Sequence, residues 1–265
     1  MRLTALRTPA LTHFAAPLST TAVQAELTAA IDCGGIDVWR INLDSPLPVG
    51  WQQCLPAEDF DRAARFVFQT DRTRFLCGHF SMRSLLGRYC AQAPRDLAFV
   101  TNTHGKPALS AHPSIGFNLS HSGNQATLAV GRQNAIGIDI ERVEDHGDSW
   151  ALAQQLFSDE EMNEIDSLSR DALIVPFLTG WTRKEACLKA LGVGLSLDPR
   201  RLSVGLLPTR TIIPDPLAAG TIEVITLDIG PDTILSLAVR GAPALAGDAL
   251  RLLEFDPRLP MGRAN

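Results

Sequence analysis

Residues 136–141, Ile-Gly-Ile-Asp-Ile-Glu, decide how the rest of this chain is interpreted. Isoleucine alternates here with Gly137, Asp139 and Glu141, which is the period-two pattern of a strand with one face in a core. Asp139 and Glu141 are therefore expected on the other face, with Cα atoms roughly 7 Å apart. Two such carboxylates repel each other unless water or a cation lies between them, and Mg²⁺ accepts an oxygen pair of this kind. A solvated strand edge with two unpaired acids explains this stretch alone equally well.

The composition is that of a globular protein with a substantial core. The 265 residues are 45% hydrophobic and 20% charged, and the length suits one large domain or two of ordinary size. No apolar run approaches the ~18 residues that a membrane span needs. The net charge of −5 argues against a nucleic-acid binder, whose contact surface would be basic. We therefore expect no membrane and no nucleic acid as partner, and any phosphate site must be a local basic cluster.

The cysteines and the N-terminus bear on the compartment. The first 25 residues contain two arginines, many Ser and Thr, and no acid before Glu26. This composition loosely suggests a transit peptide, but the apolar core of a signal peptide is missing. We expect a cytoplasmic protein whose first ~30 residues are a frayed or family-variable extension. The cysteines occur singly, which fits reduced thiols better than disulfides or a zinc site: Cys33, Cys54, Cys77, Cys90 and Cys187.

The first half of the chain begins with a strand, continues through helices and ends in strands. A strand is expected over 36–43, bounded by glycines before it and by a Pro-rich loop after it. Apolar spacing predicts helices over 57–69 and about 71–92. Shorter extended segments are expected at 97–100, 115–119 and 125–130.

The second half follows the same order. After the strand at 136–141, Ser158 with Glu161 three residues later predicts a capping box and a helix start. A helix is expected over about 172–191, with Pro176 disturbing its first turns. Strands are expected at 221–227 and 233–239, and the turn residues between them predict a hairpin. We therefore predict an α+β fold of two similar halves, residues 1–133 and 134–265, joined near 132–134.

Residues 181–189, Trp-Thr-Arg-Lys-Glu-Ala-Cys-Leu-Lys, are a second informative stretch. Glu185 and Lys189 are four residues apart and therefore adjacent on one helix face. An ordinary surface Glu–Lys pair, worth only tenths of a kcal/mol, explains them when they are taken alone. Lys184 is expected to be structural.

Residues 117–123, Phe-Asn-Leu-Ser-His-Ser-Gly, are a third such stretch. Ser120 and His121 lie between two expected strands, where side chains can reach a ligand. A serine nucleophile is conceivable, but the G-x-S-x-G elbow is absent and no strand-to-helix turn follows. A loop histidine that satisfies backbone groups explains His121 as well.

Together with Gly105-Lys106-Pro107, these stretches resemble the 4′-phosphopantetheinyl transferase superfamily. The resemblance is to its larger, monomeric, surfactin-synthetase-activating type, which modifies polyketide and nonribosomal peptide synthetases. The G-I-D-I-E strand, the W-x-x-K-E-A-x-x-K helix and Gly-Val-Gly-Leu at 192–195 occur at family spacing. The resemblance extends from about residue 36 to residue 240.

The resemblance implies two α/β halves related by a pseudo-twofold axis, each a small, mostly antiparallel sheet packed with helices. Coenzyme A would bind in the cleft between them. Members use Mg²⁺ to transfer 4′-phosphopantetheine from coenzyme A to a serine of an apo acyl or peptidyl carrier protein, and they release adenosine 3′,5′-bisphosphate. We therefore expect an enzyme of the holo-[acyl-carrier-protein] synthase class, monomeric, that activates carriers of fatty acid, polyketide or nonribosomal peptide synthesis.

The motif positions imply roles for particular residues. Asp139, Glu141 and Glu185 would be the metal carboxylates, with Glu141 tuning metal affinity more than the chemical step. Asp139, Glu185 and Lys189 would carry catalysis, because such transfers depend on positioning and charge neutralisation. Lys189 would contact the pyrophosphate, and Glu185 is our candidate base for the serine hydroxyl, acting directly or through a metal-bound water.

The remaining implied contacts are to the nucleotide. Lys106 and Pro107 would lie beside the adenine nucleotide. Ser120, His121 and Arg62 would bind the 3′-phosphate region, with Arg74 as a further candidate.

Two other functions remain open on the sequence alone. The first is a Ser120–His121 hydrolase, which an acyl-ester assay with Ser120→Ala would separate from a transferase. The second is a catalytically weak coenzyme A-binding module that regulates a synthase, against which the intact Asp139, Glu185 and Lys189 argue.

Overall fold

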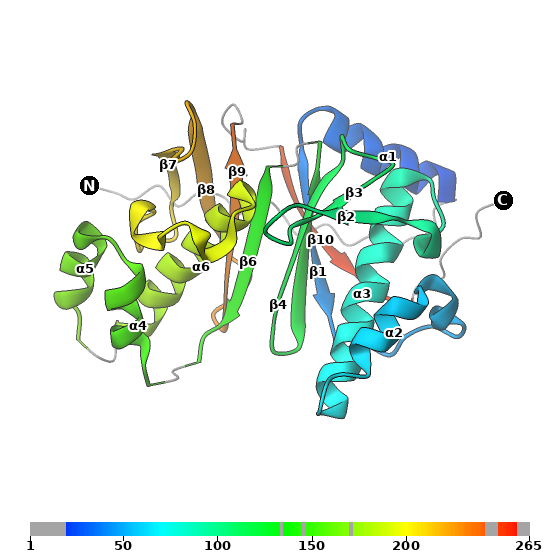
Figure 1. The fold of residues 1–265 in the computed structure, drawn as a ribbon, viewed down its shortest axis with the longest axis horizontal. Coiled ribbons are helices and arrows are strands. Elements are labelled where there is room, and N and C mark those ends of the chain that lie inside the picture. Colours follow the sequence, from blue (N-terminus) through cyan, green and yellow to red (C-terminus); the bar gives the residue numbers. More distant parts are fainter. Residues whose placement is uncertain (1–19, 133–134, 145–146, 170–171, 242–248, 259–265) are drawn as a thin grey trace.

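The computed structural model of the protein describes residues 20–132, 135–144, 147–169, 172–241 and 249–258. Two four-stranded sheets stand side by side at its centre, with helices on their outer sides (Figure 1). The first sheet contains, in spatial order, β10 (Leu250–Phe255), β1 (Ile36–Asn42), β5 (Gln125–Gly131) and β4 (Gly116–Ser122). The second contains β6 (Ile136–Arg142), β9 (Thr233–Arg240), β8 (Thr221–Leu227) and β7 (Arg210–Pro214). The fold is α+β, as expected.

The two halves repeat one topology. In the first, β1 is followed by α2 (Ala57–Ala63), α3 (Gln69–Cys90) and the β4–β5 hairpin, whose second strand pairs antiparallel with β1. In the second, β6 is followed by α4 (Ser149–Leu156), α5 (Asp159–Asp166), α6 (Ile174–Leu191) and the β8–β9 hairpin, whose second strand pairs antiparallel with β6. Each half is therefore a mostly antiparallel sheet packed with helices, as the family resemblance implies.

The C-terminal strand joins the first sheet. Although β10 lies in the second half of the sequence, it pairs in parallel with β1. Arg251 on β10 donates two hydrogen bonds to the buried Asp37 of β1, at 2.6 and 2.7 Å, and the Tyr89 hydroxyl donates to the same carboxylate. The chain therefore crosses between the two sheets twice.

The N-terminal region contributes to the core. Residues 20–32, expected in a frayed or variable extension, form α1 (Thr20–Asp32). Leu27 and Ile31 are fully buried in the cluster between α3 and the first sheet, so their burial orders this helix. Residues 1–19 of the expected extension, and residues 133–134 of the expected junction, lie outside the described residues. No helix in the described part of the chain is long and apolar enough to span a bilayer.

Several boundaries differ from the sequence expectation. The helix expected over 57–69 ends at Ala63, because Phe66, Val67 and Phe68 follow one another and cannot share one helix face. α3 then begins at Gln69. The short strands on either side of Gly105-Lys106-Pro107 pair as a hairpin of β2 (Phe99–Thr101) and β3 (Pro107–Leu109).

The second half shows the expected capping box and helix end. Ser158 accepts a hydrogen bond from the Glu161 backbone N–H, and the Glu161 carboxylate accepts one from the Ser158 N–H. Pro176 falls in the first turn of α6, where a missing N–H costs little, and Gly192 ends the helix with a φ of 70°. The short helix α4 was not anticipated.

Candidate active site

Gly137 allows β6 to lie directly against α6. A Cβ atom at this position would overlap the α6 backbone and lie 2.9 Å from the carbonyl carbon of Lys189, closer than real Cβ atoms approach. Alternate residues of a strand share one face, so Asp139 and Glu141 face the same helix as Gly137. The close approach therefore brings these two acids to the helix that carries Glu185 and Lys189.

Asp139 is the most enclosed acid of this group. Its side chain accepts hydrogen bonds at Oδ1 from Lys189 Nζ at 2.5 Å and from Ser120 Oγ at 2.8 Å. Burial raises the pKa of Asp139, although the Lys189 ammonium acts in the opposite direction. The second oxygen, Oδ2, is buried and has no hydrogen-bond partner among the described residues. Asp139 thus keeps one carboxylate oxygen available for a further donor or cation.

Glu141 and Glu185 complete a set of three interacting acids. Glu141 Oε2 accepts a hydrogen bond from Ser122 Oγ at 2.8 Å. Burial raises the pKa of Glu141, and the charge of Asp139 raises it further. Burial also raises the pKa of Glu185, and the charges of Asp139 and Glu141 add to that effect. The structure thus brings the three acids within electrostatic range of one another, with Lys189 as the neighbouring cation.

These acids do not form a finished metal site by themselves. Among the residues that the structure describes, no three His, Cys, Asp or Glu side chains are arranged to hold a metal ion. Lys189 Nζ also donates to Ser120 Oγ at 3.1 Å and to the Ile138 carbonyl at 3.3 Å, so it is held from both halves. Mg²⁺ is usually bound by one or two carboxylates together with substrate phosphates and water. The donor set fits a cation that arrives with a phosphate ligand.

Strand β4 supplies three polar side chains that the sequence analysis did not group. Asn118, Ser120 and Ser122 alternate along β4 and therefore share one face. Their partners on β6 are, in order, the Ile138 N–H at 2.8 Å, Asp139 Oδ1 and Glu141 Oε2. Side-chain hydrogen bonds thus join the first half to the second at the acids. The period-two spacing of these polar residues is the signal that would have identified the set.

Arg62 and His121 line one pocket. Its volume is about 400 Å³, and Phe75, His79 and Arg74 also line it. The Arg62 guanidinium lies over the Phe75 ring, 5.3 Å from its centroid. This pocket gathers basic side chains from α2, α3 and β4.

Arg74 and Ser120 are placed differently from Arg62 and His121. Arg74 lines the pocket but already forms an ion pair with Asp44 at 2.7 Å. Ser120 and His121 are consecutive in β4, so their side chains point to opposite faces. Ser120 therefore lies with Asp139, whereas His121 lines the pocket.

Lys106 and Pro107 line a separate pocket of about 450 Å³ near the end of α6. Lys106 Nζ donates hydrogen bonds to the carbonyls of Ile136 at 3.0 Å and Ala190 at 3.4 Å. Burial lowers the pKa of Lys106 to about 8. Lys106 thus links the β2–β3 hairpin to the second half, apart from Arg62 and His121.

Lys184 is structural, as expected. It is fully buried and pairs with the buried Glu161 at 2.6 Å. Its ammonium also donates to the Pro199 carbonyl at 3.0 Å and to the Leu202 carbonyl. Lys184 therefore fixes α6 to the start of α5 and to the loop at 199–205.

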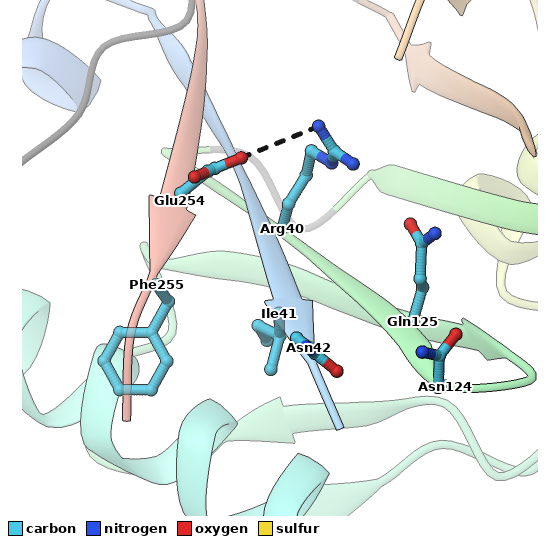
Figure 2. A pocket seen from close by; sticks show the side chains of 7 residues that line it. All are labelled: Arg40, Ile41, Asn42, Asn124, Gln125, Glu254 and Phe255. Carbon is cyan, nitrogen blue, oxygen red and sulfur yellow. Dashed lines mark ion pairs between the residues drawn. The ribbon is translucent and has the colours of Figure 1, made fainter. Parts of the chain in front are cut away.

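A further pocket lies at the end of β1 and contains none of the predicted site residues (Figure 2). Its volume is about 340 Å³, and the amides of Asn42, Asn124 and Gln125 line it. Arg40 and Glu254 face each other there across adjacent strands, 3.7 Å apart. Every polar residue that lines this pocket is exposed or partly exposed.

Comparison with known proteins gives two family matches along the chain. Residues 135–227 match the model of the 4′-phosphopantetheinyl transferase superfamily. Residues 45–133 match the model described as 4′-phosphopantetheinyl transferase, N-terminal. The two matches therefore adjoin each other between β5 and β6.

Individual relatives agree with these matches. The 4′-phosphopantetheinyl transferase HetI of Nostoc sp. is 36% identical over 180 residues, which cover 66% of this chain and 76% of that protein. The 4′-phosphopantetheinyl transferase Sfp of Bacillus subtilis is 31% identical over 173 residues, 64% of this chain and 76% of that protein. An L-aminoadipate-semialdehyde dehydrogenase-phosphopantetheinyl transferase of Xenopus laevis is 30% identical and covers 66% of each chain. With both halves matched and the acids of β6 lying against α6, this chain belongs to the 4′-phosphopantetheinyl transferase superfamily, as an enzyme of the larger, two-half type.

Proposed function

We propose that the protein transfers the 4′-phosphopantetheine group of coenzyme A to a serine of an apo acyl or peptidyl carrier protein. The reaction would require Mg²⁺ and would release adenosine 3′,5′-bisphosphate. The observation that carries the proposal is the cluster of Asp139, Glu141 and Glu185 beside Lys189. Phosphoryl transfer depends on positioning and on neutralising negative charge, and this cluster offers ligands and a cation for both.

Asp139, Glu141 and Glu185 would hold the magnesium ion together with the phosphates of coenzyme A, which would complete the ligand set that the acids alone do not form. Two observations support this assignment: Asp139 Oδ2 has no hydrogen-bond partner among the described residues, and the pKa values of Glu141 and Glu185 are raised by burial and by neighbouring carboxylates. A bound divalent cation would relieve both. When bound, Mg²⁺ would neutralise charge on the pyrophosphate of coenzyme A. Glu141 would adjust the affinity for the ion more than the chemical step.

The nucleotide would be held by side chains that line two pockets. Arg62 and His121, which line one pocket, would bind the 3′-phosphate. Lys106 and Pro107 would lie beside the adenine nucleotide at the second pocket. Ser120, which donates to Asp139, would contact the phosphates next to the acids.

The chemical step exchanges one phosphorus–oxygen bond for another. The serine oxygen of the carrier would attack the phosphorus that bears the pantetheine arm, and its proton would pass to Glu185. The bond from that phosphorus to the oxygen of the adenosine phosphate would break, and Lys189 would stabilise the negative charge of the leaving group.

The test is to incubate the protein with coenzyme A, Mg²⁺ and an apo carrier protein, and to weigh the carrier by mass spectrometry. We expect the carrier to gain the mass of one phosphopantetheine, and EDTA to prevent the gain until Mg²⁺ or Mn²⁺ is restored. Tight coenzyme A binding without any mass gain would instead favour a regulatory module. We also propose that the functional halves are residues 1–133 and 134–265, with β10 returning to the first.

A further inference from the structure

The junction between α2 and α3 exposes an apolar patch. Val67 and Phe68 are 88% and 70% exposed, and the neighbouring Phe66 is 38% exposed. Single exposed apolar residues are ordinary, but three in succession on a loop form a continuous surface. This patch, residues 66–68, lies at the lower end of α3 in Figure 1.

The patch is held in place by the residues around it. The Phe66 ring packs on Phe75 with 5.3 Å between centroids. Arg72 donates a hydrogen bond from Nη2 to the Phe66 carbonyl at 3.2 Å. Phe66 is therefore anchored on α3, and this anchoring directs Val67 and Phe68 outward.

The surroundings of the patch are basic. Residues 62–74 contain four arginines and one acid, Asp71, in a chain of net charge −5. Arg65 is exposed and forms no ion pair with another described residue, so its charge is available to a partner. An apolar centre with arginines at its edge complements a surface that is apolar and acidic.

The patch is continuous with the proposed nucleotide site. Phe66 and Arg62 line the same pocket as His121, the pocket proposed for the 3′-phosphate. A protein bound at residues 66–68 would therefore lie beside the pocket proposed for the 3′-phosphate of coenzyme A. This continuity argues for the acceptor substrate as the occupant, in preference to an unrelated protein.

We infer that residues 66–68, together with Arg65, dock the apo carrier protein through an apolar face bordered by acidic residues. The inference rests on the proposed function, since it assigns a contact surface to the acceptor of that reaction. The arginines guide the acidic rim of the carrier, and Val67 and Phe68 contact its apolar centre.

The experiment separates docking from transfer. An apo acyl carrier protein whose acceptor serine is replaced by alanine cannot react, so its Kd is measured by fluorescence anisotropy with coenzyme A present. Val67→Asp and Phe68→Ser are expected to weaken carrier binding by about tenfold or more. Arg65→Glu is expected to weaken it and to reduce its dependence on salt concentration. Leu217→Ser, an exposed apolar residue between β7 and β8, is the matched control and should bind the carrier normally.

Several outcomes would overturn the docking surface. The first is a carrier Kd that stays at the wild-type value in all three variants, and the second is a wild-type protein that binds no carrier. An equal loss of coenzyme A affinity would assign the patch to the nucleotide pocket instead. A wild-type dimer that the variants convert to monomers, with carrier Kd unchanged, would assign it to a second copy of this chain. Carrier binding through the patch without transfer to the intact serine would support the docking surface and overturn the proposed function alone.

Discussion

Replacing Gly137 with alanine tests whether the contact between β6 and α6 creates the site. The added Cβ would lie 2.9 Å from the carbonyl carbon of Lys189, whereas ordinary contacts begin at 3.4 Å. Relieving the overlap with this one atom moves the helix by about 0.5 Å. Backbone atoms of Ala186 and Ala190 lie closer to the added Cβ, so relieving their overlaps requires a larger movement. Overpacking of this kind costs about 1–3 kcal/mol of stability.

The same movement separates the catalytic groups. Lys189 is 2.5 Å from Asp139, so a shift of α6 lengthens this contact and moves Glu185 together with it. A misplacement of ~1 Å can reduce a rate by ~10²-fold, so a shift of half that size predicts a loss of about tenfold or more. The assays are urea unfolding and single-turnover transfer to a carrier protein.

Gly78→Ala is the matched control for stability. Gly78 is a buried glycine within α3, and a Cβ there meets only the Leu43 side chain, at an ordinary 3.5 Å. This variant should gain about 0.5–1 kcal/mol, because alanine is favoured over glycine inside helices. The reasoning would be refuted if Gly137→Ala unfolded at the wild-type urea concentration and transferred at the wild-type rate.

Three further outcomes are expected. His121→Ala should raise the KM for coenzyme A much more than the KM for dephospho-coenzyme A, and equal increases in steady-state assays would remove the 3′-phosphate role. Lys184→Met should cost about 3–5 kcal/mol in urea unfolding, because Glu161 is left buried without its partner, and Glu161→Gln in the same chain should restore part of the loss; a cost below ~1 kcal/mol would contradict the ion pair's role. Lys106 has a pKa of about 8 when folded and an ordinary value of 10.5, so the unfolded chain binds more protons between these values and the stability should rise with pH across that window. Lys106→Met should lack this rise in thermal unfolding scans at pH 8 to 10.5, and an identical pH profile in both proteins would contradict the assignment.

Local patterns predicted the elements that carry the acids well. The alternation of isoleucines at 136–140 places β6 correctly, and the Ser158–Glu161 capping box marks the start of α5. The strand is nevertheless buried on both faces. The sequence left open that the face of Asp139 and Glu141 is exposed to solvent, whereas in the structure α6 covers this face. Gly137 was the available signal for that close approach, since only glycine admits it.

Contacts between distant segments could not be predicted in the same way. The return of β10 to β1 depends on Arg251 and Asp37, which are 214 residues apart. Ser120 contacts Asp139 and His121 lines the Arg62 pocket because the two side chains lie on opposite faces of β4. We expected a loop at these residues, and a loop has no two defined faces. The packing of Phe66, which follows α2, on Phe75 of the next helix is likewise a contact that the local pattern did not predict.

The central claim is that the acids of β6 and α6 bind one divalent cation together with coenzyme A. Mn²⁺ binding, followed by electron paramagnetic resonance with coenzyme A present, tests it most directly. The account predicts that wild-type protein binds Mn²⁺ under these conditions, and that Asp139→Asn and Glu185→Gln each weaken this binding while the fold is retained. Undiminished Mn²⁺ binding in both folded variants would contradict it.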